Sequence, residues 1–166
     1  MIARKLATAF ALMLLALPAA CTSEGNAASA SEKTAPKIIP LTIKGSNGTH
    51  SFKVETAKTA KEQEVGLMYR TDIPKDGGML FAPYPPGGGA PKMASFWMKN
   101  TPSPLDIIFI RADGTIARIA ENTVPFSETP IPSGEPVGAV LEIGGGRALD
   151  LGIAEGDTVT WSAGKP

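Results

Sequence analysis

The sequence has very little of the chemistry from which metal and redox sites are built, with one cysteine and one histidine in 166 residues. Cys21 and His50 cannot form a Cys/His metal cluster, an intramolecular disulfide or a Cys-x-x-Cys redox pair. The chain also lacks a surplus of positive charge, because 16 Lys and Arg balance 16 Asp and Glu. Nucleic acid is bound mainly by Lys and Arg that neutralise phosphates. We therefore expect no metal, no cofactor and no nucleic-acid partner.

Turn-forming residues are abundant instead. The 18 glycines and 15 prolines make up about a fifth of the chain, compared with the usual ~12%, and 43% of the residues are apolar. This composition favours short strands and long turns over a bundle of helices. The length is that of one folding unit, which typically has ~100–200 residues.

The N-terminus has the pattern of a secretory signal peptide. Arg4 and Lys5 precede an apolar run over residues 6–17. A basic head, an apolar stretch and small residues before the cleavage point are typical of such peptides. The run is too short to span a bilayer, which takes about 20 residues. We predict that residues 1–20 are a signal peptide and that the mature protein is exported to the periplasm.

Cys21 directly follows this segment and is preceded by Pro18-Ala-Ala. The order resembles a bacterial lipobox, in which the cysteine is lipid-modified, although Pro18 stands where that pattern has a large aliphatic residue. A standard signal peptidase would instead cut after Ala20 or after Ala30. We predict lipidation of Cys21, with residues 21–36 as a flexible tether, so that the protein is a membrane-anchored lipoprotein that meets the membrane only through this anchor.

Residues 37–166 have the pattern of a single β-rich domain. Short alternating runs flank a turn at residues 45–48, and two further runs flank Asp113-Gly114. Both patterns are typical of β-hairpins, because the turn residues supply positive φ angles. We interpret residues 122–136, which are rich in proline, as a connection.

One helix is expected within this domain. Thr59 and Glu62 have the spacing of a capping box and predict a short α-helix near residues 58–68, with Gly66 weakening its last turn. The whole pattern predicts a mainly β fold, either a β-sandwich or a distorted barrel of about seven or eight short strands.

Two carboxylates, Asp106 and Glu142, interrupt runs that are otherwise apolar. A buried carboxylate is costly unless it is paired or hydrogen-bonded. One interpretation is structural: the carboxylates pair with Arg70 or Lys99, and Asp106 accepts hydrogen bonds from residues 99–101. The other is catalytic, since two carboxylates on adjacent strands can act as acid and base in glycoside hydrolysis.

The segment Phe96-Trp-Met-Lys-Asn-Thr101 places an aromatic ring and a thioether beside a cation, an amide and a hydroxyl. Such a mixed edge can line a pocket that stacks on an apolar or sugar ring and hydrogen-bonds its rim. The alternative is that Phe96 and Met98 belong to the core while Trp97 faces outward, or the reverse.

Six motifs occur in a fixed order: Gly66-Leu-Met-Tyr-Arg70, Gly78-Met-Leu-Phe81, Phe96-Trp-Met-Lys-Asn-Thr101, Pro104-Leu-Asp-Ile-Ile-Phe-Ile110 with Asp113-Gly114, Val140-Leu-Glu-Ile143 and Gly152-Ile…Gly156-Asp157. Through them, about residues 40–162 resemble the domain of unknown function 192 family. The resemblance implies a small exported or membrane-tethered protein of mainly β, sandwich-like structure, and it implies no established activity. The loop at residues 83–91 is longer and richer in Pro and Gly than the resemblance implies, which leaves open whether it forms a pocket wall.

The leading hypothesis is an exported binding or accessory module without catalytic activity. Its polar cleft is expected to hold a small polar or carbohydrate-like ligand, or a peptide of an envelope protein. The family's pattern and the residue types place in this cleft Arg70, Trp97, Lys99, Asn100, Thr101, Asp106 and Glu142. The alternative is a carboxylate-dependent hydrolase that acts on a cell-envelope polymer, with Asp106 and Glu142 as its catalytic pair. A third hypothesis is a structural accessory protein whose polar residues only stabilise the fold.

Overall fold

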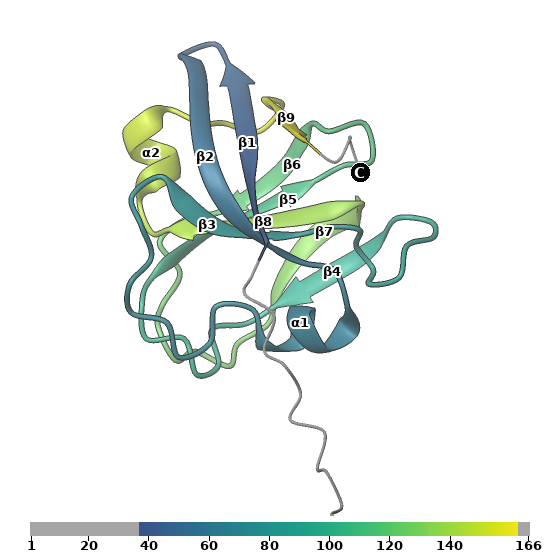
Figure 1. The fold of residues 1–166 in the computed structure, drawn as a ribbon, viewed down its shortest axis with the longest axis vertical. Helices are drawn as coiled ribbons and strands as arrows, with labels where there is room; N and C mark the ends of the chain where they lie inside the picture. Colours follow the sequence, from purple (N-terminus) through teal and green to yellow (C-terminus); the bar gives the residue numbers. More distant parts are fainter. Residues whose placement is uncertain (1–36, 163–166) are drawn as a thin grey trace, which may run out of the picture. The chain divides into compact units, whose positions relative to one another are not determined.

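The computed structural model describes residues 37–162, which form nine strands and two short helices (Figure 1). The strands are β1 (Ile38–Gly45), β2 (Gly48–Ala57), β3 (Gly77–Phe81), β4 (Lys92–Phe96), β5 (Leu105–Ile110), β6 (Ile116–Ala120), β7 (Ile131–Val137), β8 (Ala139–Gly144) and β9 (Thr158–Trp161), and the helices are α1 (Ala60–Val65) and α2 (Arg147–Leu151). Within these residues, no helix is long and apolar enough to cross a membrane. The predicted signal peptide, Cys21 and the predicted tether lie outside the described residues and stay predictions.

Seven of the strands form one curled sheet in the order β6-β5-β8-β3-β2-β1-β9. Its two edges approach each other, because Thr115 forms an isolated antiparallel bridge with Thr158 and the Val159 amide donates to the Gly114 carbonyl. The two remaining strands, β4 and β7, pair in a second small sheet. The prediction of a mainly β domain with a distorted barrel or sandwich architecture is confirmed.

Both predicted hairpins are present. β1 pairs with β2 across the turn between Gly45 and Gly48, and β5 pairs with β6 across Asp113-Gly114. The interpretation of residues 122–136 as a connection throughout is wrong, because β7 begins at Ile131. Its prolines have no N–H to donate, and they are accommodated because β7 pairs with β4 alone.

Helix α1 begins with the predicted capping box. The Thr59 hydroxyl accepts from the Glu62 amide at 3.2 Å, and the Glu62 carboxylate accepts from the Thr59 amide at 2.8 Å. The helix is shorter than the predicted span of residues 58–68, because it ends at Gly66, whose φ angle of 48° lies outside the helical range. The chain then turns back toward the sheet.

The core has two parts, one on each face of the curled sheet. Successive side chains of a strand point to opposite faces. Thus Leu141 and Ile143 of β8 pack inside the curl, whereas Val140 packs against Phe81 and Phe109 on the outer face. The β4–β7 sheet and the segment that follows α1 cover that outer face, and Leu67, Ala94 and Val137 belong to the same cluster. The candidate site described below lies in this outer layer.

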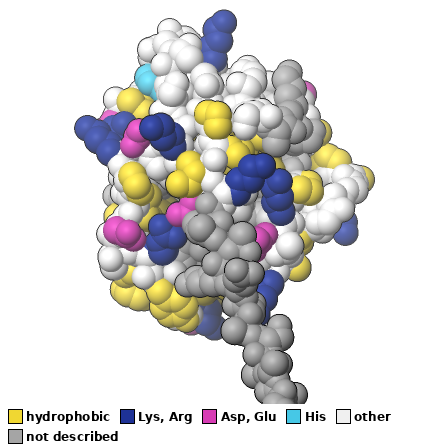
Figure 2. Space-filling view, in the orientation of Figure 1, with side chains coloured by type: hydrophobic (Ala, Val, Ile, Leu, Met, Phe, Trp, Pro, Cys, Tyr) yellow, Lys and Arg dark blue, Asp and Glu magenta, His cyan; other side chains and the backbone are white. Residues whose placement is uncertain are grey.

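Charges of both signs are distributed over the surface. Figure 2 shows Lys and Arg side chains interspersed with Asp and Glu on one face, with hydrophobic side chains between them. The ion pairs of the described residues are Arg70–Glu55, Arg70–Asp72, Lys99–Glu128, Arg111–Glu135 and Arg147–Asp150. Apart from the half-buried Arg70–Glu55, each pair has at least one exposed partner, and such pairs contribute little stability. The buried polar groups are therefore the more informative place to look for function.

Candidate functional site

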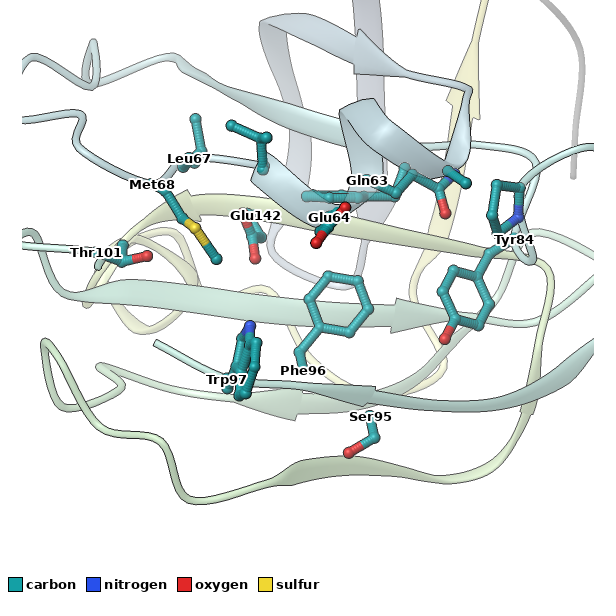
Figure 3. Close-up of a pocket in the computed structure, with 15 residues that line it drawn as sticks. Gln63, Glu64, Leu67, Met68, Tyr84, Ser95, Phe96, Trp97, Thr101 and Glu142 are labelled. Carbon is teal, nitrogen blue, oxygen red and sulfur yellow. The ribbon is translucent and has the colours of Figure 1, made fainter. Parts of the chain in front are cut away.

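A cavity of about 330 Å³ opens between α1, the loop after β3, and the end of β4. Figure 3 shows Gln63 and Glu64 of α1 on one side of it, Phe96 and Trp97 on the other, and Glu142 between them. We call it the Glu142 cavity. Its lining consists of Ala60, Gln63, Glu64, Val65, Gly66, Leu67, Met68, Phe81, Tyr84, Pro86, Ser95, Phe96, Trp97, Thr101 and Glu142.

Glu142 is the buried acid of this cavity. It lies in β8 opposite Met79 of β3 and Ile107 of β5, both apolar and buried. Its side chain is 5% exposed, and no described residue forms a hydrogen bond or an ion pair with it. Burial without a compensating partner raises the pKa of Glu142 from 4.5 to about 8. The cavity therefore contains a carboxyl group that carries its proton at pH 7.

Gly66 allows α1 to approach this carboxyl group. A Cβ atom at this position would lie 3.0 Å from Phe81 Cζ and 3.8 Å from Glu142 Oε2. The positive φ angle of the residue also favours glycine. The backbone after α1 can thus pack directly over the floor of the cavity, where any side chain would take up space beside Glu142.

Gln63 fixes the position of α1 over the sheet. Its Nε2 group donates to the Ala57 carbonyl at 3.1 Å and to the Pro83 carbonyl at 2.9 Å, which ties the helix to the end of β2 and to the loop after β3. Because both amide hydrogens are used in this way, the orientation of the amide is determined. Its Oε1 atom is buried and has no hydrogen-bond partner among the described residues. A second buried oxygen acceptor is therefore left unpaired in the lining of the Glu142 cavity.

Aromatic rings form much of the wall. The Phe96 ring lies edge-on to Phe81 at 5.1 Å between ring centres, edge-on to Phe109 at 6.0 Å, and tilted against Tyr84 at 6.0 Å. Trp97 is 45% exposed at the rim, with Lys99 Nζ 5.0 Å from its ring centre. Trp97 thus faces outward while Phe96 packs inward, which agrees with the first of the two arrangements considered for this segment.

Asp106 does not take part in this cavity. The register pairs Asp106 with Ile143 and Ile107 with Glu142, so the two carboxylates point to opposite faces of the sheet. Asp106 is fully buried and accepts from the backbone amides of Asn122 at 2.7 Å, Gly146 at 2.9 Å and Ala148 at 2.7 Å. The expected partners at residues 99–101 and the expected acid–base pair with Glu142 are both absent from the described part of the chain.

Three of the other expected cleft residues also lie away from the cavity. Arg70 binds the Glu55 carboxylate through two hydrogen bonds, the shorter at 2.9 Å, and Lys99 pairs with Glu128 at 3.6 Å. Asn100 has a positive φ angle and donates to the Tyr69 hydroxyl at 2.9 Å. The expected ion pair of Glu142 with Arg70 or Lys99 is therefore not formed, because both cations already have partners at the surface.

The structure thus brings together three of the seven expected residues: Trp97, Thr101 and Glu142. The sequence reasoning did not find Gln63 and Glu64, nor Tyr84 of the proline-rich loop. The available signals were Gly66, which directly follows the capped helix, and the unusual length of the loop at residues 83–91. The sequence left open whether that loop forms a pocket wall, and in the structure it contributes Tyr84 and Pro86 to the lining.

The chemistry of the cavity follows from its charge and polarity. Its lining contains two carboxyl groups, Glu64 at the exposed rim and Glu142 inside, and no Lys or Arg. Nowhere in the described part of the chain do three or more His, Cys, Asp or Glu side chains group in a way that could hold a metal ion. The arrangement is suited to a ligand that has an apolar or ring-shaped body and one polar group directed at Glu142.

Comparison with known proteins gives one family and related solved structures. The model of the family DUF192, described as "Uncharacterized ACR", matches residues 41–161. A protein of unknown function from Novosphingobium aromaticivorans is 46% identical, with a TM-score of 0.71 over 82% of this chain and 100% of that one. A protein from Sinorhizobium meliloti described as a "putative transcription regulator" is 40% identical, with a TM-score of 0.72 over 78% of this chain and 98% of that one. No curated protein gives a significant match.

Proposed function

The chain belongs to the DUF192 family of uncharacterised proteins, and we propose that its domain is a binding module for a small organic ligand in the Glu142 cavity. One observation carries this proposal: the cavity holds a buried carboxyl group with no partner among the described residues. A buried polar group without a hydrogen bond costs free energy. A ligand that supplies the missing partner recovers that cost as binding energy.

Asp106 provides an internal comparison for this argument. Both carboxylates are buried in β-strands of the same sheet, yet Asp106 is satisfied by three backbone amides and Glu142 by none. The contacts of Asp106 are those expected of a carboxylate that stabilises the fold. Glu142 faces a cavity of about 330 Å³ instead, which is within the range of small-molecule sites, ~300–1,000 Å³.

The size and walls of the cavity favour a compact ring-bearing ligand over a peptide or a polymer chain. Phe96, Tyr84 and Trp97 offer ring faces and edges for stacking. Hydrolysis by paired carboxylates finds no support in the separation of Asp106 and Glu142 onto two faces of the sheet. Export and a lipid anchor at Cys21 are part of the proposal and rest on residues 1–21 alone.

A set of single-ring probes tests the binding proposal: benzyl alcohol, benzamide and benzylamine, titrated against the domain by ligand-observed NMR. We expect at least one of them to bind, and we expect Trp97→Ala to weaken that binding about fivefold, because it removes a half-exposed ring from the rim. Phe126→Ala is the matched control, since Phe126 is also an exposed aromatic residue but does not line the cavity.

The controls make the result decisive. Both variants should keep the thermal stability of the wild type, because both side chains are exposed. Failure of all three probes to bind would remove the proposed function. Binding that Trp97→Ala and Phe126→Ala reduce equally would place the ligand outside the Glu142 cavity.

A further inference from the structure

We propose that the Glu142 cavity selects a small organic amine, in which a protonated primary or secondary amino group is attached to an apolar or ring-shaped body. The inference rests on the proposed function and adds to it the chemical class of the ligand. It follows from the charges in the lining, the hydrogen-bonding atoms left unpaired, and the aromatic wall.

The charges of the lining exclude one class of ligand and favour another. The ionisable side chains that face the cavity are Glu64 and Tyr84 at its sides and Glu142 inside, and no Lys or Arg is among the lining residues. An anionic ligand would be desolvated beside a carboxyl group with no cation to compensate it. A cationic ligand gains an ion pair with Glu142, which is only 5% exposed, and the attraction between two charges is stronger at a buried group than at the surface.

The hydrogen-bonding groups of the cavity favour the same class of ligand. In the described part of the chain, the fully buried side-chain atom without a partner is an oxygen, Gln63 Oε1. The Glu142 carboxyl group, 5% exposed and without a partner among the described residues, is a pure acceptor when it is ionised. The Thr101 hydroxyl already donates to the Lys99 carbonyl at 3.1 Å and keeps its acceptor capacity. Hydrogen-bond acceptors that lack a donor favour a ligand whose N–H groups donate to them, such as an ammonium.

The aromatic wall suits the same class. Cations bind favourably to the faces of Trp, Tyr and Phe rings within about 6 Å of their centres. Trp97 already makes one such contact with Lys99 at 5.0 Å. Trp97, Tyr84 and Phe96 all line the cavity, so they can contact both the apolar body of an amine and its charge.

Binding requires a proton to leave the cavity. In the empty protein the Glu142 carboxyl group carries a proton at neutral pH, because burial raises its pKa to about 8. When the ammonium form of the amine enters, Glu142 becomes a carboxylate and its proton passes to the solvent. The ammonium keeps all its hydrogens and donates to the carboxylate, so charge and protons balance. Glu64 and Tyr84, the other ionisable groups of the lining, lie at the sides of the cavity and provide no cation that would stabilise the carboxylate in place of the ligand.

This exchange gives the affinity a characteristic pH dependence. The ionised fraction of a group with a pKa of about 8 rises about 50-fold between pH 6 and pH 8. The affinity for a protonated amine is expected to rise by about the same factor over this range and then to level off. Binding of a neutral ligand of the same shape does not require Glu142 to ionise, so its affinity should not rise with pH in this way.

Isothermal titration calorimetry with benzylamine and benzyl alcohol tests the inference, because the two probes differ mainly in the amino group. Wild-type protein is expected to bind benzylamine at least tenfold more tightly than benzyl alcohol at pH 8. At pH 7, titrations in buffers of different ionisation enthalpy should show release of about 0.9 protons for each benzylamine bound. Benzoate, which has the opposite charge, should not bind.

Two variants separate the role of Glu142 from that of overall charge. Glu142→Gln is expected to weaken benzylamine binding at least tenfold and to abolish the proton release, whereas benzyl alcohol, which forms no ion pair with Glu142, should be affected much less. Glu121→Gln removes the same charge at an exposed position outside the lining. It should change the affinity for either probe by no more than twofold. Thermal melts of both variants confirm that each is folded.

The possible results distinguish the inference from the proposed function. If benzyl alcohol binds as tightly as benzylamine and Glu142→Gln has no selective effect, the amine class is wrong while the binding cavity stands. If neither probe binds, and benzamide does not bind either, both the inference and the proposed function fail.

Discussion

Replacing Glu142 with Gln is expected to make the domain more stable relative to wild type as the pH rises. The difference in the free energy of unfolding between variant and wild type should grow by about 3 kcal/mol between pH 4.5 and pH 7. A stabilising effect of this size is unusual for a single substitution, since most mutations destabilise.

The direction of this effect follows from proton linkage. Burial raises the pKa of Glu142 from 4.5 in the unfolded chain to about 8 in the folded domain, so the folded state binds more protons between these values. The wild type therefore loses about 1.4 kcal/mol of stability for each pH unit in that window, and the loss ends above about pH 8. Glutamine does not titrate, so Glu142→Gln removes the slope.

Urea denaturation of wild type and Glu142→Gln at pH 4, 5.5, 7 and 8.5 measures this difference. Glu121→Gln is the matched control, because its carboxyl group is exposed and should leave the wild-type slope unchanged. A difference between Glu142→Gln and wild type that is constant with pH would contradict the account of the buried acid. The expected result means that the domain keeps a carboxyl group at the expense of its stability at neutral pH.

The opposite effect on stability is expected when the other buried carboxylate, Asp106, is replaced. Asp106→Asn should lower the free energy of unfolding by about 2–4 kcal/mol, because charge-assisted hydrogen bonds from three backbone amides to this buried carboxylate are lost or weakened. Asparagine retains one acceptor oxygen and directs an NH2 group at a backbone N–H. Gly146, which precedes α2, has no side chain to cap that helix. Asp106 of β5 caps it instead, by accepting from the Gly146 and Ala148 amides.

Denaturation of Asp106→Asn beside Asp157→Asn tests this role. Asp157 accepts from one backbone amide, that of Ala154 at 2.9 Å. Loss of this hydrogen bond should lower the free energy of unfolding by about 1 kcal/mol or less. Hydrogen exchange should show the Gly146 and Ala148 amides losing protection in Asp106→Asn. If Asp106→Asn had the stability of the wild type and its Gly146 and Ala148 amides were still protected, the structural role of Asp106 would be ruled out. Ligand binding should be retained, because the Glu142 cavity lies on the other face of the sheet.

The sequence predicts the parts of the fold that depend on neighbouring residues. The capping box of Thr59 and Glu62 is a contact over three positions, and Asp113-Gly114 marks its hairpin by local turn geometry. β7 was missed for the same reason, because its prolines favour a loop locally. Its pairing with β4, which is about 40 residues earlier in the chain, places it at an edge where prolines are tolerated.

The site could be predicted only in part, because distant segments assemble it. Trp97, Thr101 and Glu142 stand out by residue type, but α1 and the loop at residues 83–91 reach the cavity only through tertiary packing. The separation of Asp106 from Glu142 depends on the register of β5 against β8, which shifts every side chain to the other face when it moves by one residue. No local pattern in the sequence determines that register.

The most direct test of the central claim is a carbon-13 NMR titration of the Glu142 carboxyl group in the wild-type protein, with and without saturating benzylamine. The account predicts a midpoint of about pH 8 in the free protein, because the empty cavity leaves the acid desolvated and unpaired. It predicts a lower midpoint in the presence of benzylamine, because the bound ammonium stabilises the carboxylate. A midpoint near the ordinary value of 4.5 in the free protein, or one that saturating benzylamine leaves unchanged, would contradict it.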